Sequence, residues 1–555
     1  MNTKTKNTKE LERKARKGEL LSAFQLYLNY KDGLDDVIVD SNLSKKYLQQ
    51  CIDYIENIKS NSLGIYLPKN KLTLVNIELF DLRVFKHLKM SFEPDLTVII
   101  GNNGQGKTTI LNAISKTLSW INANILKEEG QGQRLSELYD IRRGTEKDFT
   151  DVLSEFNFGS GLKRINARLS RSKLGASSRR ESDIKNLREI SNIFRIINEI
   201  HLLNLPLCAY YSVDRSYQLQ RTTKDNANLR DERFDAYNFS LVGSGKFEHF
   251  VEWFISLHKK TVNDNTAKIE ELEQQVKALN ESVKSGITAL IPLLETTQKQ
   301  LDDALAILER ANDNSFLSDA TKKEIVVAAI CKVIPSISNI WVETESGSDI
   351  VFVTNDSVDI TIEQLSDGQR TFLGLIADLV RRLVMLNPKL NNPLEGQGIV
   401  LIDEIELHLH PKWQQDVLLD LKNCFPNIQF IISTHSPLVL STVDRKNIRY
   451  FSGFDINGGT IIEAPDYQTK GILNSDILEQ LMGTFAKPAR VEESHWLEKF
   501  EKMLIAADYS ENEDAKSLYG KIKYHFGEGS FEIQKSDSLI RLQAMRKKAL
   551  EKSKK

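Results

Sequence analysis

The chain has 555 residues, and at roughly 150 residues per domain this length predicts three or four domain-sized pieces. Hydrophobic residues make up 41% of the chain and charged residues 27%, which excludes a largely disordered or fibrous protein. The 74 basic and 76 acidic residues nearly cancel, so any nucleic-acid-binding surface must be local rather than a property of the whole chain.

Cysteine usage and hydropathy indicate a reducing, aqueous compartment. The four cysteines lie far apart and form no CxxC pair, so we expect neither a disulfide framework nor a four-thiolate zinc site. The first residues are basic and lack an apolar run, which argues against a signal peptide. No apolar stretch approaches the 18 or so residues that a membrane span needs. We therefore expect a cytoplasmic protein that does not use a membrane.

The amino-terminal part, residues 1–65, is predicted to be a helical extension. Seven Lys or Arg within residues 1–18 suggest a solvated tail. Apolar residues then recur at three- and four-residue steps over residues 20–58, with a break at Asp32-Gly33, which predicts a helical hairpin. Such a hairpin would either pack on the main fold or dock a partner, and the residues favour neither.

Strand patterns follow in residues 66–245. The runs KLTLVNIELF, LKMSF and LTVII look like short strands, and the last of them ends at a glycine. A helix is expected over residues 110–126, and alternating polarity over residues 150–170 predicts a small antiparallel lobe. The segment 161–180 holds seven basic residues and no acidic one, and we expect it to form a mobile loop on this lobe.

A helical insertion is predicted over residues 246–345. Its apolar residues follow the 3-4 spacing of a coiled coil, interrupted by Gly286 and Pro292. We therefore expect a short antiparallel hairpin whose arms of ~20 residues are about 30 Å long. The seam consists of Ile269, Leu272, Val276, Leu279, Val283, Leu290, Leu294, Leu301, Leu305 and Leu308.

Parallel-sheet character is expected to return over residues 346–470. IVFVT at 350–354, GIVLI at 398–402 and QFIIS at 429–433 are short apolar runs, typical of strands buried on both faces. A helix is predicted over residues 371–386. The pattern therefore indicates an α/β core split by the helical insertion and followed, over residues 471–555, by a charged helical tail.

The most specific motif is a glycine-rich loop. Residues 101–108, GNNGQGKT, match GxxxxGK[ST] between a predicted strand and a predicted helix, which is the context that this motif requires. Glycines let backbone N–H groups approach a phosphate closely. Lys107 is expected to reach the β- and γ-phosphates of ATP, and the Thr108 hydroxyl to hold Mg²⁺. The nucleotide-binding residues predicted here are Asn102, Asn103, Gly104, Gln105, Gly106, Lys107, Thr108 and Thr109.

Two adjacent carboxylates, Asp403 and Glu404, follow the apolar strand GIVLI. Asp403 would support the Mg²⁺ ligand shell. Glu404 would polarise the attacking water, a general-base role typically worth about 10²- to 10⁴-fold in rate. A strand that ends in Asp-Glu is weak evidence alone, but combined with the glycine-rich loop it favours nucleotide hydrolysis.

Two further motifs point to the same chemistry. The run LSDGQ, residues 365–369, opens the helix at 371, where Ser366 and Gly368 would bind an anion through free N–H groups and the helix dipole. An ordinary helix N-cap explains the same residues. His435 follows the strand QFIIS, where it would sense a γ-phosphate, although a histidine at a strand end is more often structural. Lys107, Glu404 and His435 are the predicted catalytic residues.

The set GNNGQGKT, LSDGQ, IVLIDE and STHSP, in this order, resembles the head of ATP-binding-cassette ATPases of the branch that includes SMC and RecF. The resemblance implies a P-loop NTPase fold of the α/β class, with a mixed sheet and an antiparallel lobe. It implies that two copies sandwich ATP, so that Ser366, Gly368 and Gln369 of one copy close over the nucleotide of the other. His435 would then contact the γ-phosphate.

One element of this family's pattern is missing. The glutamine of its Q-loop, which relays the nucleotide state to partners, has no evident counterpart, and Gln131 and Gln133 are the candidates.

Within that branch, DEIELHLHPKWQ followed by STHSP is most similar to ATPases of bacterial antiphage defence, namely the overcoming-lysogenization nucleases and the Septu ATPases. The former carry a nuclease domain with a DxD pair, and residues 446–555 contain none. The Septu resemblance implies an ATPase that regulates a separately encoded HNH nuclease, sometimes with a retron reverse transcriptase and its DNA–RNA hybrid. His408 and His410 lie in this stretch, where a structural turn is a simpler interpretation than a metal site.

Two other functions remain in view: a RecF- or SMC-like repair ATPase that clamps DNA directly, and a scaffold that binds ATP without hydrolysing it. The predicted hairpin is short and lacks a CxxC pair, which argues against the repair ATPase. The basic runs 161–180 and 541–555 are candidate nucleic-acid contacts, although solvated surface explains them equally well. Neither run contains interleaved aromatic residues, so we expect no base stacking.

Overall fold

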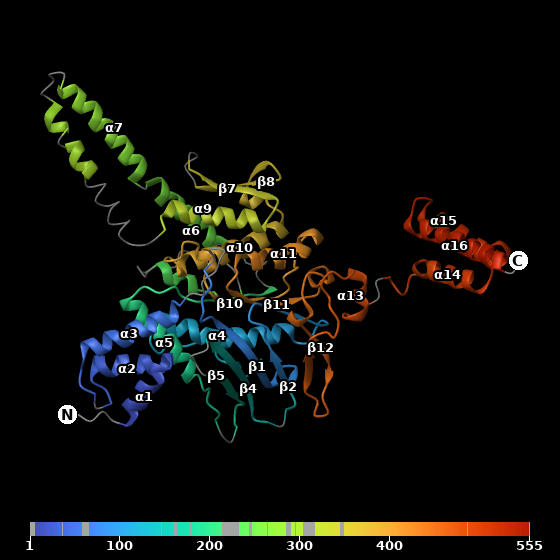
Figure 1. The fold of residues 1–555 in the computed structure, drawn as a ribbon, viewed down its shortest axis with the longest axis horizontal. Helices are drawn as coiled ribbons and strands as arrows, with labels where there is room; N and C mark the ends of the chain where they lie inside the picture. Colours follow the sequence, from blue (N-terminus) through green and yellow to red (C-terminus); the bar gives the residue numbers. More distant parts are fainter. Residues whose placement is uncertain are drawn as a thin grey trace. The chain divides into compact units, whose positions relative to one another are not determined.

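The structure is a computed structural model, drawn in Figure 1. The chain divides into two compact units, Met1–Ile472 and Leu473–Lys555, which are described separately. The structure describes residues 6–553 except for 36, 58–65, 146, 160–163, 177–178, 214–231, 244–246, 264, 285–289, 295, 303–316, 345–348 and 485–486.

The first unit contains both helices and strands. Its α-helices are α1 Lys6–Arg16, α2 Leu20–Asp32, α3 Ser41–Ile55, α4 Lys107–Leu126, α5 Lys185–Ile200, α6 Phe247–Asn263, α7 Asn265–Lys284, α9 Asp319–Val333, α10 Asp367–Leu386, α11 Pro411–Cys424 and α12 Pro437–Leu440. Its strands are β1 Leu72–Leu82, β2 Phe85–Ser91, β3 Leu96–Ile100, β4 Phe149–Phe158, β5 Ile165–Ser172, β6 Leu207–Tyr211, β7 Ile337–Glu343, β8 Ile350–Asn355, β9 Val358–Thr361, β10 Gly398–Ile402, β11 Ile428–Thr434, β12 Ile448–Phe454 and β13 Thr460–Glu463. The second unit contains α13 Asn474–Gln480, α14 Trp496–Ala506, α15 Glu513–Phe526 and α16 Phe531–Ser553.

The first unit is built on one mixed sheet of ten strands in the order β5-β4-β1-β2-β13-β12-β3-β11-β10-β6. The strands β12, β3, β11, β10 and β6 run parallel to one another, and β12 pairs antiparallel with β13 on its other side. At the other end, β2, β1, β4 and β5 form an antiparallel lobe. The predicted α/β fold of a P-loop NTPase, with a mixed sheet and an antiparallel lobe, is therefore confirmed.

Helices cover both faces of the parallel strands. Figure 1 shows α4 on one side of β10 and β11, and α10 and α11 on the other. Every residue of β3, β6, β10 and β11 is buried as a result. This two-sided burial explains why these strands are continuous apolar runs in the sequence instead of alternating ones.

Two buried glutamines attach the antiparallel lobe to the parallel core. The pairing of β1 with β2 begins at Asn76, so the preceding residues of β1 lack a strand on that side. There, the Gln429 side chain accepts from the Leu74 N–H (2.8 Å) and donates to the carbonyls of Leu74 (2.9 Å) and Glu93 (2.8 Å). The Gln397 side chain similarly accepts from the Leu72 N–H at 2.9 Å. These side chains pair backbone groups that would otherwise be buried and unsatisfied.

The amino-terminal extension contains three helices, so the predicted tail is wrong. The two predicted helices are α2 and α3, with the break at Gly33 in a left-handed conformation (φ +74°). Helix α1 lies where a solvated tail was expected, because Ala15 and one face of the helix are buried against α2. The extension packs on the main fold, since the Tyr54 hydroxyl donates to the Phe158 carbonyl at 2.8 Å.

In the described part of the predicted helical insertion, α6, α7 and α9 are helices, but residues 337–343 form strand β7, so the prediction is wrong for that segment. Leu272 and Val276 of α7 pack against Leu294 and Leu301 of the returning arm, as an antiparallel hairpin requires. The predicted seam residues Leu305 and Leu308, and Gly286 in the turn, lie outside the described residues.

The run IVFVT was assigned to the parallel sheet, and this assignment is wrong. It forms β8, which pairs antiparallel with β7 and β9 in a separate three-stranded sheet. Residues along β8 alternate between buried and half-buried, so only one face of this strand is covered. A short apolar run does not by itself distinguish these two environments.

The basic run 161–180 was predicted to be a loop, and most of its described part is not. Residues 165–172 form β5, which pairs antiparallel with β4 because Ile165, Ala167 and Leu169 turn one face into the core. Only the residues after Ser172 leave the sheet. Residues 161–163 and 177–178 of the run lie outside the described part of the chain.

The second unit is helical, as expected for the tail, and has a hydrophobic core of its own. The core contains Phe500, Leu504, Ala515, Leu518, Ile522 and Ile533. The basic run at the carboxyl end lies on α16, where Lys547 forms an ion pair with Asp508 at 2.8 Å; residues 554–555 lie outside the described range. Among the described helices of both units, none combines the length and the hydropathy that a membrane span requires.

We predict that Gln429→Met, which keeps the side-chain length, lowers the free energy of unfolding by roughly 3 kcal/mol, because three buried backbone groups lose their partners. Urea unfolding followed by circular dichroism measures this change. Gln49→Met, at an exposed position on α3, is the matched control and should stay within about 0.5 kcal/mol of the parent. Equal stability of the two variants would show that the glutamine junction contributes nothing.

Candidate active site

The predicted site residues gather at one edge of the sheet because three parallel strands end there together. Ile100, at the end of β3, pairs with Thr434, at the end of β11. Ile402, at the end of β10, pairs with Ile432 of β11. The glycine-rich loop, His435 and Asp403 therefore leave the sheet side by side, at the carboxyl edge where α/β proteins bind their ligands.

The glycine-rich loop needs glycine at Gly106. Its backbone has φ +100°, and an added Cβ would lie 2.4 Å from the Cζ atom of Phe85. Phe85 cannot move aside easily, because it is buried and its ring stacks on that of Phe451 with 6.4 Å between centroids. The loop thus rests on two aromatic rings and turns directly into α4.

The start of α4 offers backbone donors to an anion. Because the helix begins at Lys107, the N–H groups of its first residues have no acceptor within the helix, and the positive end of the helix dipole lies beside them. Asn102, Asn103 and Gly104 are exposed on the loop. The Gln105 side chain accepts from the Asn102 N–H at 2.6 Å and closes the loop. This arrangement suits a phosphate group.

Lys107 lies inside the loop. Its ammonium donates to the carbonyls of Gly101 (2.9 Å) and Asn102 (3.2 Å). Burial lowers the pKa of the Lys107 ammonium, whereas the carboxylates of Asp403, Glu404 and Glu406 act in the opposite direction. The ammonium is therefore held by two backbone carbonyls of the loop, with three carboxylates in its surroundings.

Thr108 and Asp403 meet across the two halves of the chain. The Thr108 hydroxyl donates to Asp403 Oδ2 at 2.7 Å, and the Ser433 hydroxyl donates to Asp403 Oδ1. Asp403 is fully buried, and its backbone N–H donates to the Tyr211 carbonyl at 2.8 Å. A hydroxyl and a carboxylate are the oxygen donors that Mg²⁺ prefers, so these residues fit that ion.

Glu404 sits in a strained backbone conformation next to this pair. Its φ is +46°, in the left-handed region that residues other than glycine seldom occupy. Its N–H donates to the Ser433 hydroxyl at 2.9 Å. Ser433 thus orients both acidic residues, and backbone strain of this kind is frequent at functional sites.

Glu406 is a site residue that the sequence analysis missed. Its two carboxylate oxygens accept from the Thr434 hydroxyl (2.7 Å) and from the His435 backbone N–H. It therefore fixes the end of β11 and the start of the His435 segment. A third acidic residue near Asp403 is visible in the sequence, but its partners depend on the pairing of β10 with β11.

The LSDGQ run forms a helix N-cap. Ser366 caps α10 by accepting from the Gln369 N–H at 3.3 Å, and the Gln369 side chain returns to the Ser366 N–H at 3.3 Å. The Gln369 amide also donates to Asn355 at 3.0 Å. Among the described residues, no hydrogen bond joins this helix start to the glycine-rich loop of the same chain.

The loop after Glu404 supports the start of α10. An added Cβ at Gly368 would lie 2.2 Å from the His408 carbonyl oxygen, so glycine is required for this contact. His408 has φ +64°, and His410 caps α11 by accepting from the Lys412 N–H at 3.3 Å. Both histidines thus have the structural positions that a turn requires.

The structure places neither Q-loop candidate among these residues. The Gln133 side chain donates to the Leu241 carbonyl at 3.1 Å, and the Gln131 side chain contacts Glu129 and Arg134. Their role stays a prediction.

A protein-family model described as "AAA domain, putative AbiEii toxin, Type IV TA system" matches residues 96–441. The match begins with β3 and spans the glycine-rich loop, the start of α10, Asp403 and His435.

Several known proteins are similar to this chain. "Retron Ec83 probable ATPase" of Escherichia coli is 30% identical over 534 residues, 93% of either chain. "Retron Vc95 probable ATPase" of Vibrio cholerae is 32% identical over 470 residues, 81% of this chain and 84% of that protein. "Septu protein PtuA" of Bacillus mycoides is 49% identical over 79 residues, 14% of this chain and 11% of that protein. A solved SMC head domain of Pyrococcus furiosus covers 71% of this chain and is itself covered to 96%, with 15% identity and a TM-score of 0.37.

We predict that Glu406→Ala lowers kcat for ATP hydrolysis about 100-fold, since loss of both hydrogen bonds lets the His435 segment shift. The KM for ATP should change little, because Glu406 binds protein groups. Glu406→Gln should retain most activity, as its amide oxygen still accepts from His435 and its NH₂ group faces the Thr434 hydroxyl. Steady-state phosphate release measures both. A loss in Glu406→Gln as deep as in Glu406→Ala would rule out this positioning role.

Proposed function

The chain belongs to the AAA-domain family whose model matches it and to the retron ATPases that align along nearly its whole length, and we propose that it hydrolyses ATP between two copies of itself. From the same membership we propose that it regulates a partner nuclease in bacterial antiphage defence. The predicted resemblance to Septu and retron-associated ATPases is confirmed by these relatives. The alignments with the two retron ATPases span 93% and 81% of the chain, and they favour this function over direct clamping of DNA in the manner of RecF or SMC.

One observation carries the proposal: the Thr108 hydroxyl lies 2.7 Å from the Asp403 carboxylate, although 295 positions separate them in the chain. A phosphate bound at the loop and a metal ion bound by these two oxygens would be adjacent. Glu404 follows directly, so a base would stand beside both.

The residues of the loop would bind and orient ATP. The N–H groups at the start of α4 would donate to the phosphates, and the Lys107 ammonium would neutralise the β- and γ-phosphate oxygens. Glu404 would accept a proton from the attacking water, and its strained backbone would hold the carboxylate in place. His435, fixed through Glu406, would donate to a γ-phosphate oxygen.

Thr108 and Asp403 would hold Mg²⁺, with Ser433 fixing the orientation of the carboxylate. The ion, when bound, would neutralise the charge that develops on the β- and γ-phosphate oxygens. The Thr108–Asp403 hydrogen bond would give way to shared ligation, which requires only that the Thr108 hydroxyl turn its proton away.

A second copy of the chain would complete the site. Ser366 is exposed at the start of α10, where the helix dipole favours an anion. Since no hydrogen bond connects this helix start with the loop of its own chain within the described residues, Ser366, Gly368 and Gln369 are proposed to close over the ATP of the partner copy. Two such contacts, related by a twofold axis, would form a closed dimer.

The regulated partner is proposed to be an HNH nuclease, with a reverse transcriptase and its DNA–RNA hybrid as further components. The retron and Septu names of the relatives support this proposal. The absence of a DxD pair from residues 446–555 is consistent with a nuclease on another chain. The basic runs 161–180 and 541–555 remain candidates for nucleic-acid contact.

We predict that Glu404→Gln binds ATP as the parent does but loses at least about 100-fold in turnover, because the amide cannot take the proton from water. With Mg²⁺ and ATP it should accumulate as a dimer, measured by light scattering after size exclusion. Glu363→Gln, at an exposed position, is the control and should behave like the parent. Parent-like turnover in Glu404→Gln would exclude this residue as the base.

The same variant tests the dimer. Adding Ser366→Arg to Glu404→Gln places a large side chain at the predicted interface, so the double variant should bind ATP but remain monomeric. A dimer of unchanged stability in the double variant would contradict closure by Ser366.

We further predict that a tagged copy of the chain, expressed from its native locus, co-purifies with an HNH nuclease. Mass spectrometry of the purified complex identifies the partner, and light scattering gives its stoichiometry. If the chain purifies without any nuclease under conditions in which the Glu404→Gln dimer is intact, the partner proposal is refuted. The ATPase proposal would still stand in that case.

A further inference from the structure

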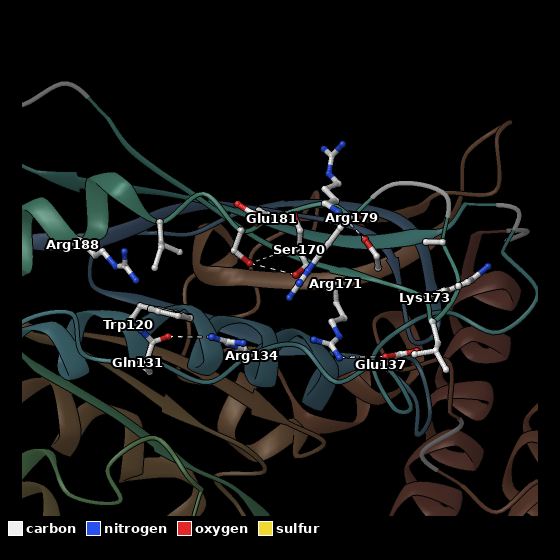
Figure 2. A pocket seen from close by; sticks show the side chains of 17 residues that line it. Trp120, Gln131, Arg134, Glu137, Ser170, Arg171, Lys173, Arg179, Glu181 and Arg188 are labelled. Carbon is white, nitrogen blue, oxygen red and sulfur yellow. Dashed lines mark hydrogen bonds and ion pairs between the residues drawn. The ribbon is translucent and has the colours of Figure 1, made fainter.

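A cleft with a volume of about 560 Å³ lies on the antiparallel lobe, separate from the residues proposed to bind ATP. One wall is β5 and the segment that follows it, the other is the segment 131–137, and Trp120 of α4 and Arg188 of α5 lie at one end (Figure 2).

Basic side chains dominate the lining. Six basic residues face two acidic ones, Glu137 and Glu181. The basic residues are Arg134, Arg171, Lys173, Arg179, Arg180 and Arg188. By contrast, the net charge of the whole chain is only -2. The cleft is thus a local concentration of positive charge.

Most of this charge has no carboxylate partner. Arg171 forms an ion pair with Glu137 at 3.2 Å, and Arg180 with Asp151 at 2.7 Å. Within the described residues, no carboxylate pairs with any of the remaining four, which are Arg134, Lys173, Arg179 and Arg188. Positive charge that a protein does not neutralise internally attracts anionic ligands.

The cations follow the cleft as a row. In Figure 2, Arg188 lies at one end and Lys173 at the other, with Arg134 and Arg171 between them. Hydroxyl groups of serines on β5 and after it lie along the same wall. A row of charges suits a ligand with repeated negative charges better than a single anion.

The cleft offers no surface for stacking a base. Trp120 is only 4% exposed, and the Arg188 guanidinium lies over its ring at 5.8 Å. Contacts would therefore go to phosphates, which carry no sequence information. The volume falls in the range of sites for small molecules, which suits a short run of nucleotides and not the width of a duplex.

We propose that this cleft binds the sugar–phosphate backbone of a single strand of nucleic acid, independently of its sequence. The proposal goes beyond the ATPase activity, because none of the cleft residues belongs to the nucleotide site. It would give the ATPase a direct contact with the nucleic acid of a defence system.

The test compares two double variants of the full chain, each of which removes two positive charges. Arg134→Gln/Arg188→Gln removes two cleft cations, and Lys9→Gln/Lys45→Gln removes two exposed lysines from α1 and α3. The probe is a fluorescent oligothymidylate of about 20 nucleotides, longer than the typical site of a single binding fold, and the readout is fluorescence anisotropy at several salt concentrations.

The cleft variant should bind the oligonucleotide at least about tenfold more weakly at low salt, and the slope of log K against log salt should fall by about 1.4, or 0.7 for each lost phosphate contact. The control should bind like the parent. Both variants should keep parental ATP turnover without nucleic acid, which separates a failure of this proposal from a failure of the proposed ATPase.

Equal binding by the cleft variant and the control would overturn the proposal, as would tighter binding of a duplex of the same length. Because Arg188 contacts a buried tryptophan, the single variant Arg134→Glu, at an exposed position, repeats the test without disturbing that contact. Parental affinity in Arg134→Glu would likewise overturn it.

Discussion

The hydrogen bonds that join Thr108, Asp403 and Ser433 are the constraint on which the site depends. They connect the start of α4 with the ends of β10 and β11, which are distant in the sequence. These groups meet because β11 lies between β3 and β10 in the sheet. The buried Asp403 is tolerated because its carboxylate accepts from two hydroxyl groups.

Strand β11 organises the molecule along its whole length. At one end, Gln429 satisfies the backbone of β1 and so attaches the antiparallel lobe. At the other end, Ser433 orients Asp403 and Glu404, and the last residues of the strand are fixed by Glu406. A shift of this strand would therefore disturb the lobe junction and the site together.

This connection bears on how the two proposed activities relate. The cationic cleft is built on the antiparallel lobe, and the ATP site lies at the edge of the parallel strands. The two are joined by the same sheet, and α4 runs from the glycine-rich loop to Trp120 and beyond. A nucleotide proposed to bind at Lys107 and a ligand proposed for the cleft would therefore lie near two different parts of the same helix.

The sequence by itself determined the motifs whose geometry is local. The glycine-rich loop between β3 and α4 could be predicted, because a glycine turn before a helix needs no distant partner, and the strand before Asp403 is recognisable by its buried apolar run.

Tertiary structure decided what depends on strand order and register. The run IVFVT forms a strand of a separate sheet, and β6 was not predicted as a strand. The hydrogen-bond partners of Glu406 and Gln429 lie on or beside neighbouring strands, so they could not be identified from the sequence. The basic run became one wall of a cleft because its apolar face pairs β5 with β4, and the second wall comes from the segment 131–137, which no pattern in the sequence connects with that run. The order of the strands in the sheet decides which side chains are in contact. That order depends on how the whole chain packs, so a local sequence pattern does not reveal it.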